Sequence, residues 1–254
     1  MWATVLCPLE DGVLGMTEPE LLNAVQWGLG VFAVISYIAL QFTEAPYGRF
    51  EASGHWLYGP RIHGKVAWVL QEMPNVCFAT SYLWACGEPS IQKISNMILL
   101  GMFLAHYVQR TFVFPLLIRG GKPTPLVVFL MAFLFCAANG YLQACTLMRH
   151  TTYPDNHLTS STFIAGTLLF LTGMAINIQS DYILRNLRVG RSTGYQIPRG
   201  GVFEYVSAAN YFGELLEWLG WAMACQTGTA YLFVFTTFSN LAPRARQHHR
   251  WYQK

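Results

Sequence analysis

Charged residues are scarce in this chain. Only 11% of its 254 residues are Asp, Glu, Lys or Arg, and 53% are hydrophobic, whereas roughly 25% of an ordinary soluble domain is charged. Residues 1–20 contain no Lys or Arg, so they lack the basic start of a cleavable signal peptide. A GxGxxG motif after a strand is also missing, which excludes a Rossmann domain.

The chain contains many long apolar runs. Runs of about 20 residues, enough to cross a bilayer, recur along its whole length, and no separate soluble domain fits between them. We therefore predict that residues 1–254 form a single polytopic membrane domain, an all-α bundle of seven transmembrane helices. The expected spans lie near residues 21–42, 64–86, 95–118, 125–147, 162–181, 205–225 and 228–243.

The distribution of Lys and Arg predicts the orientation of the bundle, because positive charges favour cytosolic loops. A luminal N-terminus and a cytosolic C-terminus leave only Lys93 and Arg149 on the luminal side. Residues 1–20 are then a short luminal segment and residues 244–254 a cytosolic tail. The net charge of +3 is mild and sits in loops beside the membrane, so nucleic acid is a poor partner.

The cysteines and histidines give no sign of a metal centre. The six cysteines are scattered without a CxxC pair, and the histidines have no ligand-like spacing. We interpret the cysteines as small apolar packing residues in helices and predict no metal site. They are Cys7, Cys77, Cys86, Cys136, Cys145 and Cys225.

Ionisable and amide side chains inside the expected spans are the strongest functional signal. A charged group in a bilayer costs several kcal/mol and therefore marks function by default. Any one of them could be satisfied by a neighbouring helix, but too many lie in the cytosolic halves of spans for packing alone. They are Gln71, Glu72, His106, Tyr107, Arg110, Asn139, Gln143, Asn177, Asp181, Arg185, Arg188, Asn210, Glu214 and Glu217.

Several of these residues share a helix face. Asn177, Asp181, Arg185 and Arg188 follow one another at helical spacing, and so do Asn210, Glu214 and Trp218. Arginine binds phosphate in a bidentate fork, while amides and carboxylates bind ribose and carboxamide groups. The pattern is typical of a nucleotide site between helices.

Six blocks of the sequence resemble the steroid 5α-reductases (3-oxo-5α-steroid 4-dehydrogenases) in order and spacing. They cover residues from about 45 to 252, and GGKP and FEYVSAANYFGE are most similar to the type 1 isoenzymes. The blocks are AWVLQEMP, FLAHYVQRTFVFPLLIRGGKP, FCAANGYLQ, NIQSDYILRNLR, GYQIPRGGVFEYVSAANYFGELLEW and HHRWY.

The resemblance implies an NADPH-dependent reduction of the 4,5 double bond of 3-oxo-4-ene steroids such as testosterone or progesterone. Hydride adds to the β-carbon of the enone, and negative charge gathers on the ketone oxygen. Glu72 and Tyr107 match the family's ketone-binding pair, and a carboxyl in an apolar run is expected to stay protonated and donate. Trp68 and Trp218 match walls of the steroid pocket.

The family's NADPH positions match ten residues of this chain. They are Tyr47, Arg110, Asn177, Asp181, Arg188, Tyr195, Asn210, Glu214, His248 and Tyr252.

The chain departs from the family's pattern at two places. Gln179 stands where relatives usually carry His. Relatives also continue past HHRWY, whereas this sequence stops at Lys254, so we expect either a truncated chain or an incomplete cytosolic end. The resemblance also implies a multi-pass protein of the endoplasmic reticulum membrane, recovered in microsomes. We expect the steroid and the lipid bilayer as partners, and a monomer.

Two other functions stay open on sequence grounds. A membrane reductase of trans-2-enoyl thioesters or polyprenols would keep Asn177, Asp181 and Asn210 without needing QEMP and HYxxR. A non-enzymatic lipid transporter would often show internal repeats, and this chain shows none. Tightly bound NADP(H) in the purified protein would distinguish an enzyme from a transporter.

Overall fold

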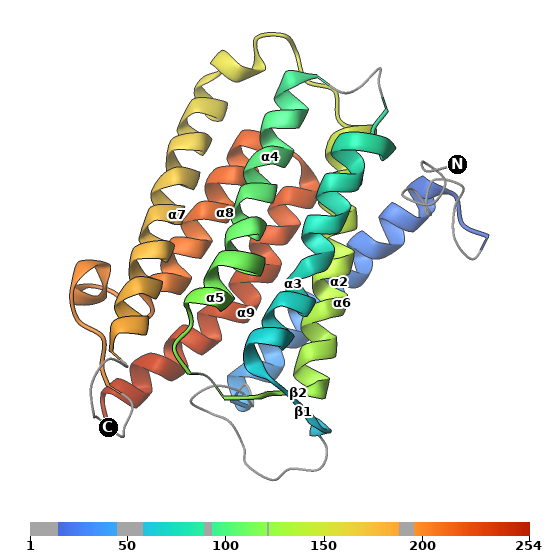
Figure 1. Ribbon diagram of the computed structural model, residues 1–254. Helices are drawn as coiled ribbons and strands as arrows, with labels where there is room; N and C mark the ends of the chain where they lie inside the picture. The colour runs from blue at the N-terminus through green and yellow to red at the C-terminus, as the bar shows by residue number, and fades with distance from the viewer. Residues whose placement is uncertain (1–14, 45–57, 89–92, 121, 188–195) are drawn as a thin grey trace.

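The computed structural model describes residues 15–44, 58–88, 93–120, 122–187 and 196–254. Seven long helical rods dominate this part of the chain (Figure 1), and each predicted span coincides with one of them, so the all-α architecture is confirmed. The rods are α2 (Glu18–Phe42); α3 (Gly64–Ser81), continued by a π-helical turn to Cys86; α4 (Ile94–Val108), continued by a π-helical turn (Gln109–Val113) into α5 (Phe114–Leu117); α6 (Leu126–Cys145), continued by a π-helical turn to His150; α7 (Ser161–Asn186); α8 (Ala209–Cys225); and α9 (Gly228–Tyr252).

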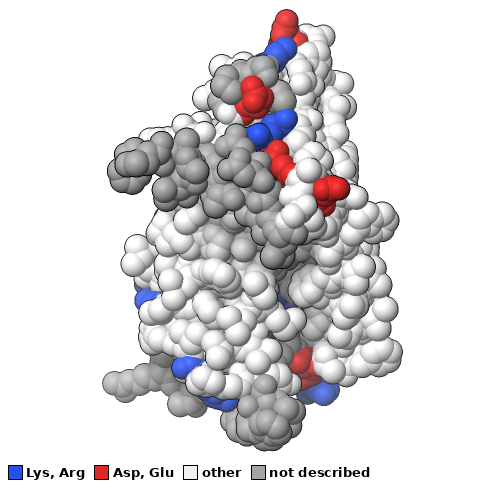
Figure 2. All heavy atoms as spheres, turned by 90° about the vertical axis from the view of Figure 1, so that its right-hand side faces the viewer, with Lys and Arg blue, Asp and Glu red and all other residues white. Residues whose placement is uncertain are grey.

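Four rods are long and apolar enough to cross a membrane. They are Glu18–Phe42, Ile94–Leu117, Leu126–His150 and Ser161–Asn186. The other three rods, α3, α8 and α9, do not meet both conditions: each is either too short or not apolar enough. Figure 2 shows one face of the molecule, almost free of charge in its middle, with Lys, Arg, Asp and Glu gathered toward its two ends. These features are typical of a membrane protein.

Contacts between the ends of the rods hold each end of the bundle together (Figure 1). At one end β1 (Arg61–Ile62) pairs antiparallel with β2 (Thr124–Pro125), which joins the start of α3 to the start of α6. At the other end Arg149 donates to the carbonyl of Cys86, and its Nε lies 3.0 Å from Glu18 Oε1. Figure 1 shows that successive rods run in alternate directions, in agreement with these contacts.

The backbones of α7 and α8 are in direct contact. Gly166 and Gly173 on α7 face Gly213 and Gly220 on α8, so neither helix presents a side chain at these points. A Cβ on Gly173 would lie 2.2 Å from the backbone nitrogen of Glu217. Small residues at such crossings let membrane helices approach closely, and here they align the two polar helix faces that the sequence predicted.

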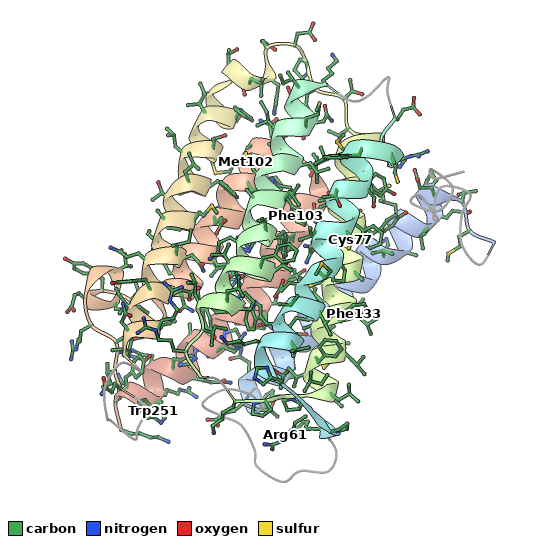
Figure 3. All side chains as sticks on the ribbon, in the orientation of Figure 1. Arg61, Cys77, Met102, Phe103, Phe133 and Trp251 are labelled. Atoms are coloured by element: carbon green, nitrogen blue, oxygen red, sulfur yellow. The ribbon has the colours of Figure 1, made fainter. Side chains whose placement is uncertain are left out.

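An aromatic cluster fills the centre of the bundle. Phe103 of α4, labelled in Figure 3, is fully buried, and its ring centroid lies 4.7 Å from that of Tyr107 and 5.9 Å from that of Trp218. Phe233 of α9 packs on Trp218 at 4.5 Å. The cluster surrounds Tyr107 with apolar rings, which sets the polarity of the site described below.

One expectation about the cysteines is wrong. Cys86 is disulfide-bonded; it is the last residue of the π-helical turn after α3, where the rod ends, and it is also buried, at 2% exposure, in the hydrophobic core. Cys136, Cys145 and Cys225 are free and buried, as expected for packing residues, and Cys77 is free and exposed.

One group among the described residues contains three potential metal ligands. The ligand atoms of Glu18, Cys145 and His150 all lie within 4.8 Å of one another. However, the same carboxylate oxygen of Glu18 already contacts both the Arg149 guanidinium and, at 2.9 Å, the His150 ring. We therefore interpret the group as an ion-pair cluster that joins α2 to the end of α6.

Substituting Gly173 with Ala tests the α7–α8 contact. The added Cβ must push the two backbones apart, and overpacking of this kind costs about 1–3 kcal/mol. Gly101→Ala is the matched control, because a Cβ there meets nothing within 4 Å. Thermal unfolding in detergent should show a lower midpoint for Gly173→Ala and no loss for Gly101→Ala. Equal midpoints would contradict the close crossing.

Candidate active site

Glu72 and Tyr107 come from different helices and meet the same turn of α6. Glu72 lies on α3 and accepts a hydrogen bond from Cys136 Sγ at 3.5 Å, while Asn139 Nδ2 donates to Tyr107 Oη at 3.4 Å. Cys136 and Asn139 are three residues apart and therefore share a face of α6. The structure thus brings together the two side chains that the sequence predicted for the ketone.

A buried ion pair links the π-helical turn after α4 to α7. Arg110 lies in the π-helical turn that follows α4, one turn beyond Tyr107, and its Nη1 lies 2.9 Å from Asp181 Oδ2. Both side chains are largely buried, with 12% and 6% of their surface exposed. The guanidinium carbon also lies 4.2 Å from the ring centroid of Phe114 and 5.0 Å from that of Trp68.

The polar faces of α7 and α8 adjoin the ion pair. Asn177, one turn before Asp181, donates through Nδ2 to the backbone carbonyl of Asn210 at 2.9 Å. Glu214, one turn after Asn210, acts electrostatically on Arg110, Asp181 and Glu72. Three carboxyl groups and one guanidinium therefore share this region, and the arrangement combines cationic, anionic and amide groups.

The last turns of α9 pack against the start of α8. The His248 ring lies 5.8 Å from that of Tyr211 and 6.4 Å from that of Tyr252. Arg244, one turn before His248, donates to Tyr211 Oη at 2.6 Å. Because Tyr211 follows Asn210 directly, α9 brings the predicted residues His248 and Tyr252 to the same end of the bundle.

The two tryptophans predicted as pocket walls occupy different places. Trp218 is 1% exposed and lies beside Tyr107, with ring centroids 5.8 Å apart. Trp68 is only half-buried and packs on Phe114, at 4.9 Å, beneath the Arg110 guanidinium. Trp218 therefore packs against Tyr107, whereas Trp68 packs against the Arg110 side of the ion pair.

Three predicted cofactor residues, Tyr47, Arg188 and Tyr195, lie outside the described residues. Gln179, which departs from the family's pattern, is exposed on α7, and its Oε1 would lie 3.1 Å from a Cβ on Gly201. It therefore faces the turn before α8 and not the Asn177–Asp181 face.

Sequence reasoning missed two residues of the site. Asn75 is fully buried and accepts a hydrogen bond from Asn139 at 3.4 Å, and Cys136 contacts Glu72 directly. Helical spacing could have indicated both, since Asn75 follows Glu72 by three residues and Cys136 precedes Asn139 by three. The sequence also did not predict that His106 pairs with Glu217, at 2.8 Å between Nδ1 and Oε1.

The His106–Glu217 pair offers a test of the buried polar core. Its side chains are 4% and 0% exposed, and removing one partner of such a pair typically costs about 3–5 kcal/mol because the other is left unpaired. His106→Leu should therefore lower the thermal midpoint more than the double variant His106→Leu/Glu217→Leu does. Glu217→Gln, which keeps a hydrogen-bonding group, is the control. Additive losses would show that the two residues do not act as a pair.

The sequence is similar to known proteins of one enzyme family. The sequence model of the family described as 3-oxo-5-alpha-steroid 4-dehydrogenase matches residues 122–254. The chain is 48% identical over 240 residues to 3-oxo-5-alpha-steroid 4-dehydrogenase 1 of Mus musculus, covering 93% of this chain and 92% of the relative. Identity to the Homo sapiens protein of the same name is 44% over 238 residues, covering 94% and 91%.

The related 3-oxo-5-alpha-steroid 4-dehydrogenase 2 of Sus scrofa is 41% identical over 232 residues, covering 89% of each chain. The match to proteins of both types extends over nearly their whole length and includes the helices that carry Glu72, Tyr107 and Asp181. This chain therefore belongs to the 3-oxo-5-alpha-steroid 4-dehydrogenase family of oxidoreductases.

Proposed function

We propose that this protein reduces the 4,5 double bond of 3-oxo-4-ene steroids to give 5α-reduced 3-oxosteroids, with NADPH as the reductant. The observation that carries the proposal is the meeting of Glu72 and Tyr107 at one turn of α6, beside the polar faces of α7 and α8. Family membership supports it, because the relatives' names describe enzymes that act on 3-oxo-5α-steroids.

The ketone is the group that Glu72 and Tyr107 are suited to bind. When a nucleophile adds to the β-carbon of an enone, negative charge develops on the carbonyl oxygen. Hydrogen-bond donors placed at that oxygen lower the barrier, and they are worth most where water is excluded. A protonated Glu72 carboxyl and the Tyr107 hydroxyl act as these donors, and Phe103 and Trp218 keep the surroundings of Tyr107 apolar.

The polar residues of α7, α8 and α9 fit a dinucleotide. A pyrophosphate and a ribose need cationic, amide and carboxylate partners, and Arg110, Asp181, Asn177 and the α9 end provide these types together. Bound NADPH would supply a hydride to the β-carbon. The residues that would hold it are Arg110, Asn177, Asp181, Asn210, Glu214, His248 and Tyr252, with Tyr47, Arg188 and Tyr195 as further candidates from sequence alone.

The membrane setting follows from the same assignment. Four apolar rods and the nearly uncharged middle of one face support a membrane setting. The seven rods correspond to the seven predicted spans, and the distribution of Lys and Arg supports a luminal N-terminus and a cytosolic C-terminus. NADPH then enters from the cytosol and the steroid from the bilayer. We assign the protein to the endoplasmic reticulum membrane on family grounds.

Substrate tests on the purified protein distinguish the possible reactions. Testosterone or progesterone incubated with NADPH should give the 5α-reduced ketone, identified by mass spectrometry against a standard. A trans-2-enoyl thioester and a polyprenol, which lack the cyclic enone, should give no product. Reduction of either compound without reduction of the steroid would replace the proposal with the related membrane reductases.

Replacing Glu72 tests its role at the ketone oxygen. Glu72→Ala should lower kcat by about a hundredfold to a thousandfold, as expected for loss of one oxyanion donor. Glu72→Gln keeps an N–H donor and should retain part of the activity. Glu20→Ala, on the exposed first turn of α2, is the control for a carboxyl outside the site. Full activity of folded Glu72→Ala at saturating steroid would end this assignment.

Replacing Arg188 tests the preference for NADPH over NADH, which differ only in the 2′-phosphate. Losing a charge-assisted contact to that phosphate costs about 1.5–3 kcal/mol. Arg188→Ala should therefore raise the KM for NADPH about tenfold or more and leave that for NADH nearly unchanged. Arg199→Ala is the comparison, because Arg199 is 77% exposed and lies 3.9 Å from Glu204; it should leave both KM values unchanged. An equal loss with both nucleotides would assign Arg188 to the pyrophosphate or the fold.

A further inference from the structure

A chain of side-chain amides connects a backbone carbonyl of α9 to the Tyr107 hydroxyl. Gln143 Nε2 donates to the Thr229 carbonyl at 3.0 Å and to Asn139 Oδ1 at 3.1 Å. Asn139 Nδ2 in turn donates to Tyr107 Oη and to Asn75 Oδ1, both at 3.4 Å. Asn139 and Gln143 are 0% and 1% exposed, so water does not compete for these bonds.

The Thr229 carbonyl sets the direction of every bond in this chain. A backbone carbonyl only accepts hydrogen bonds, so Gln143 must turn its NH2 group toward Thr229. The same NH2 group then donates to Asn139 Oδ1, and this leaves the NH2 of Asn139 facing Tyr107 and Asn75. The Tyr107 oxygen is therefore the acceptor at the end of the chain.

Asn75 follows the same direction. Its Oδ1 accepts from the NH2 group of Asn139, and its own NH2 group has the Cys136 sulfur as a neighbour. Reversing the Asn75 amide would set two NH2 groups against each other. The orientation of Asn75 therefore agrees with the direction that the Thr229 carbonyl sets.

We propose that Asn139 and Gln143 are positioning residues that direct the Tyr107 proton toward the substrate ketone. The proposal rests on the proposed function. A tyrosine hydroxyl has one proton, and because its oxygen accepts from Asn139, that proton is left for another acceptor. In the part of the chain that the structure describes, the Tyr107 hydroxyl has no acceptor of its own. Each bond in such a chain also polarises the next, so the Tyr107 hydroxyl becomes a stronger donor.

A double-mutant cycle with Tyr107→Phe separates this role from a structural one. If Asn139 acts through the Tyr107 hydroxyl, Asn139→Leu should lower kcat about fivefold to tenfold, as for one neutral hydrogen bond, with the steroid KM nearly unchanged. In the Tyr107→Phe background the same substitution should change kcat less than twofold, because the hydroxyl it acts on is gone. Gln143→Leu should follow the same pattern more weakly.

Two further variants keep the cycle interpretable. Asn139→Ala removes the amide without adding bulk and replaces Asn139→Leu in the cycle if the leucine variant does not fold. Asn96→Leu is the matched control, because Asn96 is an equally buried amide that donates to the carbonyls of Leu147 and Thr151 away from the site. It should lower the thermal midpoint without changing kcat per folded molecule.

The outcomes separate the two proposals. A wild-type protein that does not reduce 3-oxo-4-ene steroids with NADPH overturns the proposed function. If the wild-type protein does reduce them, the proposed function stands. The positioning role is then overturned if Asn139→Leu has no effect on kcat, or if its effect is equally large in the Tyr107→Phe background.

Discussion

The ion pair between Arg110 and Asp181 is the interaction on which the rest of the site depends. It joins the helix that carries Tyr107 to the helix that carries Asn177, at 2.9 Å and almost without exposure. Two charges in an apolar interior are stable only when they are paired and well oriented. The π-helical turn at Gln109–Val113 and the close α7–α8 crossing provide that orientation. The pair therefore fixes Tyr107, one of the two side chains proposed to bind the ketone, relative to the polar faces of α7 and α8.

The apolar surroundings give the few polar groups their chemical effect. In water a carboxyl group and a phenol would be weak partners for a ketone, because solvent competes for the same oxygen. Aromatic rings from α4, α8 and α9 exclude water around Tyr107, and each buried hydrogen bond is correspondingly stronger. The amide chain from Thr229 to Tyr107 uses the same property. The membrane is thus part of the proposed mechanism as well as the location of the protein.

Much of this arrangement follows from the sequence, and the rest depends on contacts between helices. Hydrophobic runs predicted the seven rods, and helical spacing predicted that Asn177 and Asp181 share a face. Spacing along one helix cannot say which residue faces it from another, so the pairings of Arg110 with Asp181 and His106 with Glu217 were not predicted. Asn75 and Cys136 were missed because small or neutral side chains in apolar runs look like packing residues. The Cys86 disulfide was missed because its spacing matches no short motif.

The most direct test of the account follows the hydrogen atoms through the reaction. NADPH carrying deuterium at the transferable position of its nicotinamide should be incubated with the purified protein and testosterone. The account predicts one deuterium at carbon 5 of the product, on the α face, with the 3-ketone intact and carbon 4 protonated from solvent. Deuterium at carbon 3, a reduced ketone, or unlabelled product would contradict the proposal that Glu72 and Tyr107 activate the enone for addition at its β-carbon.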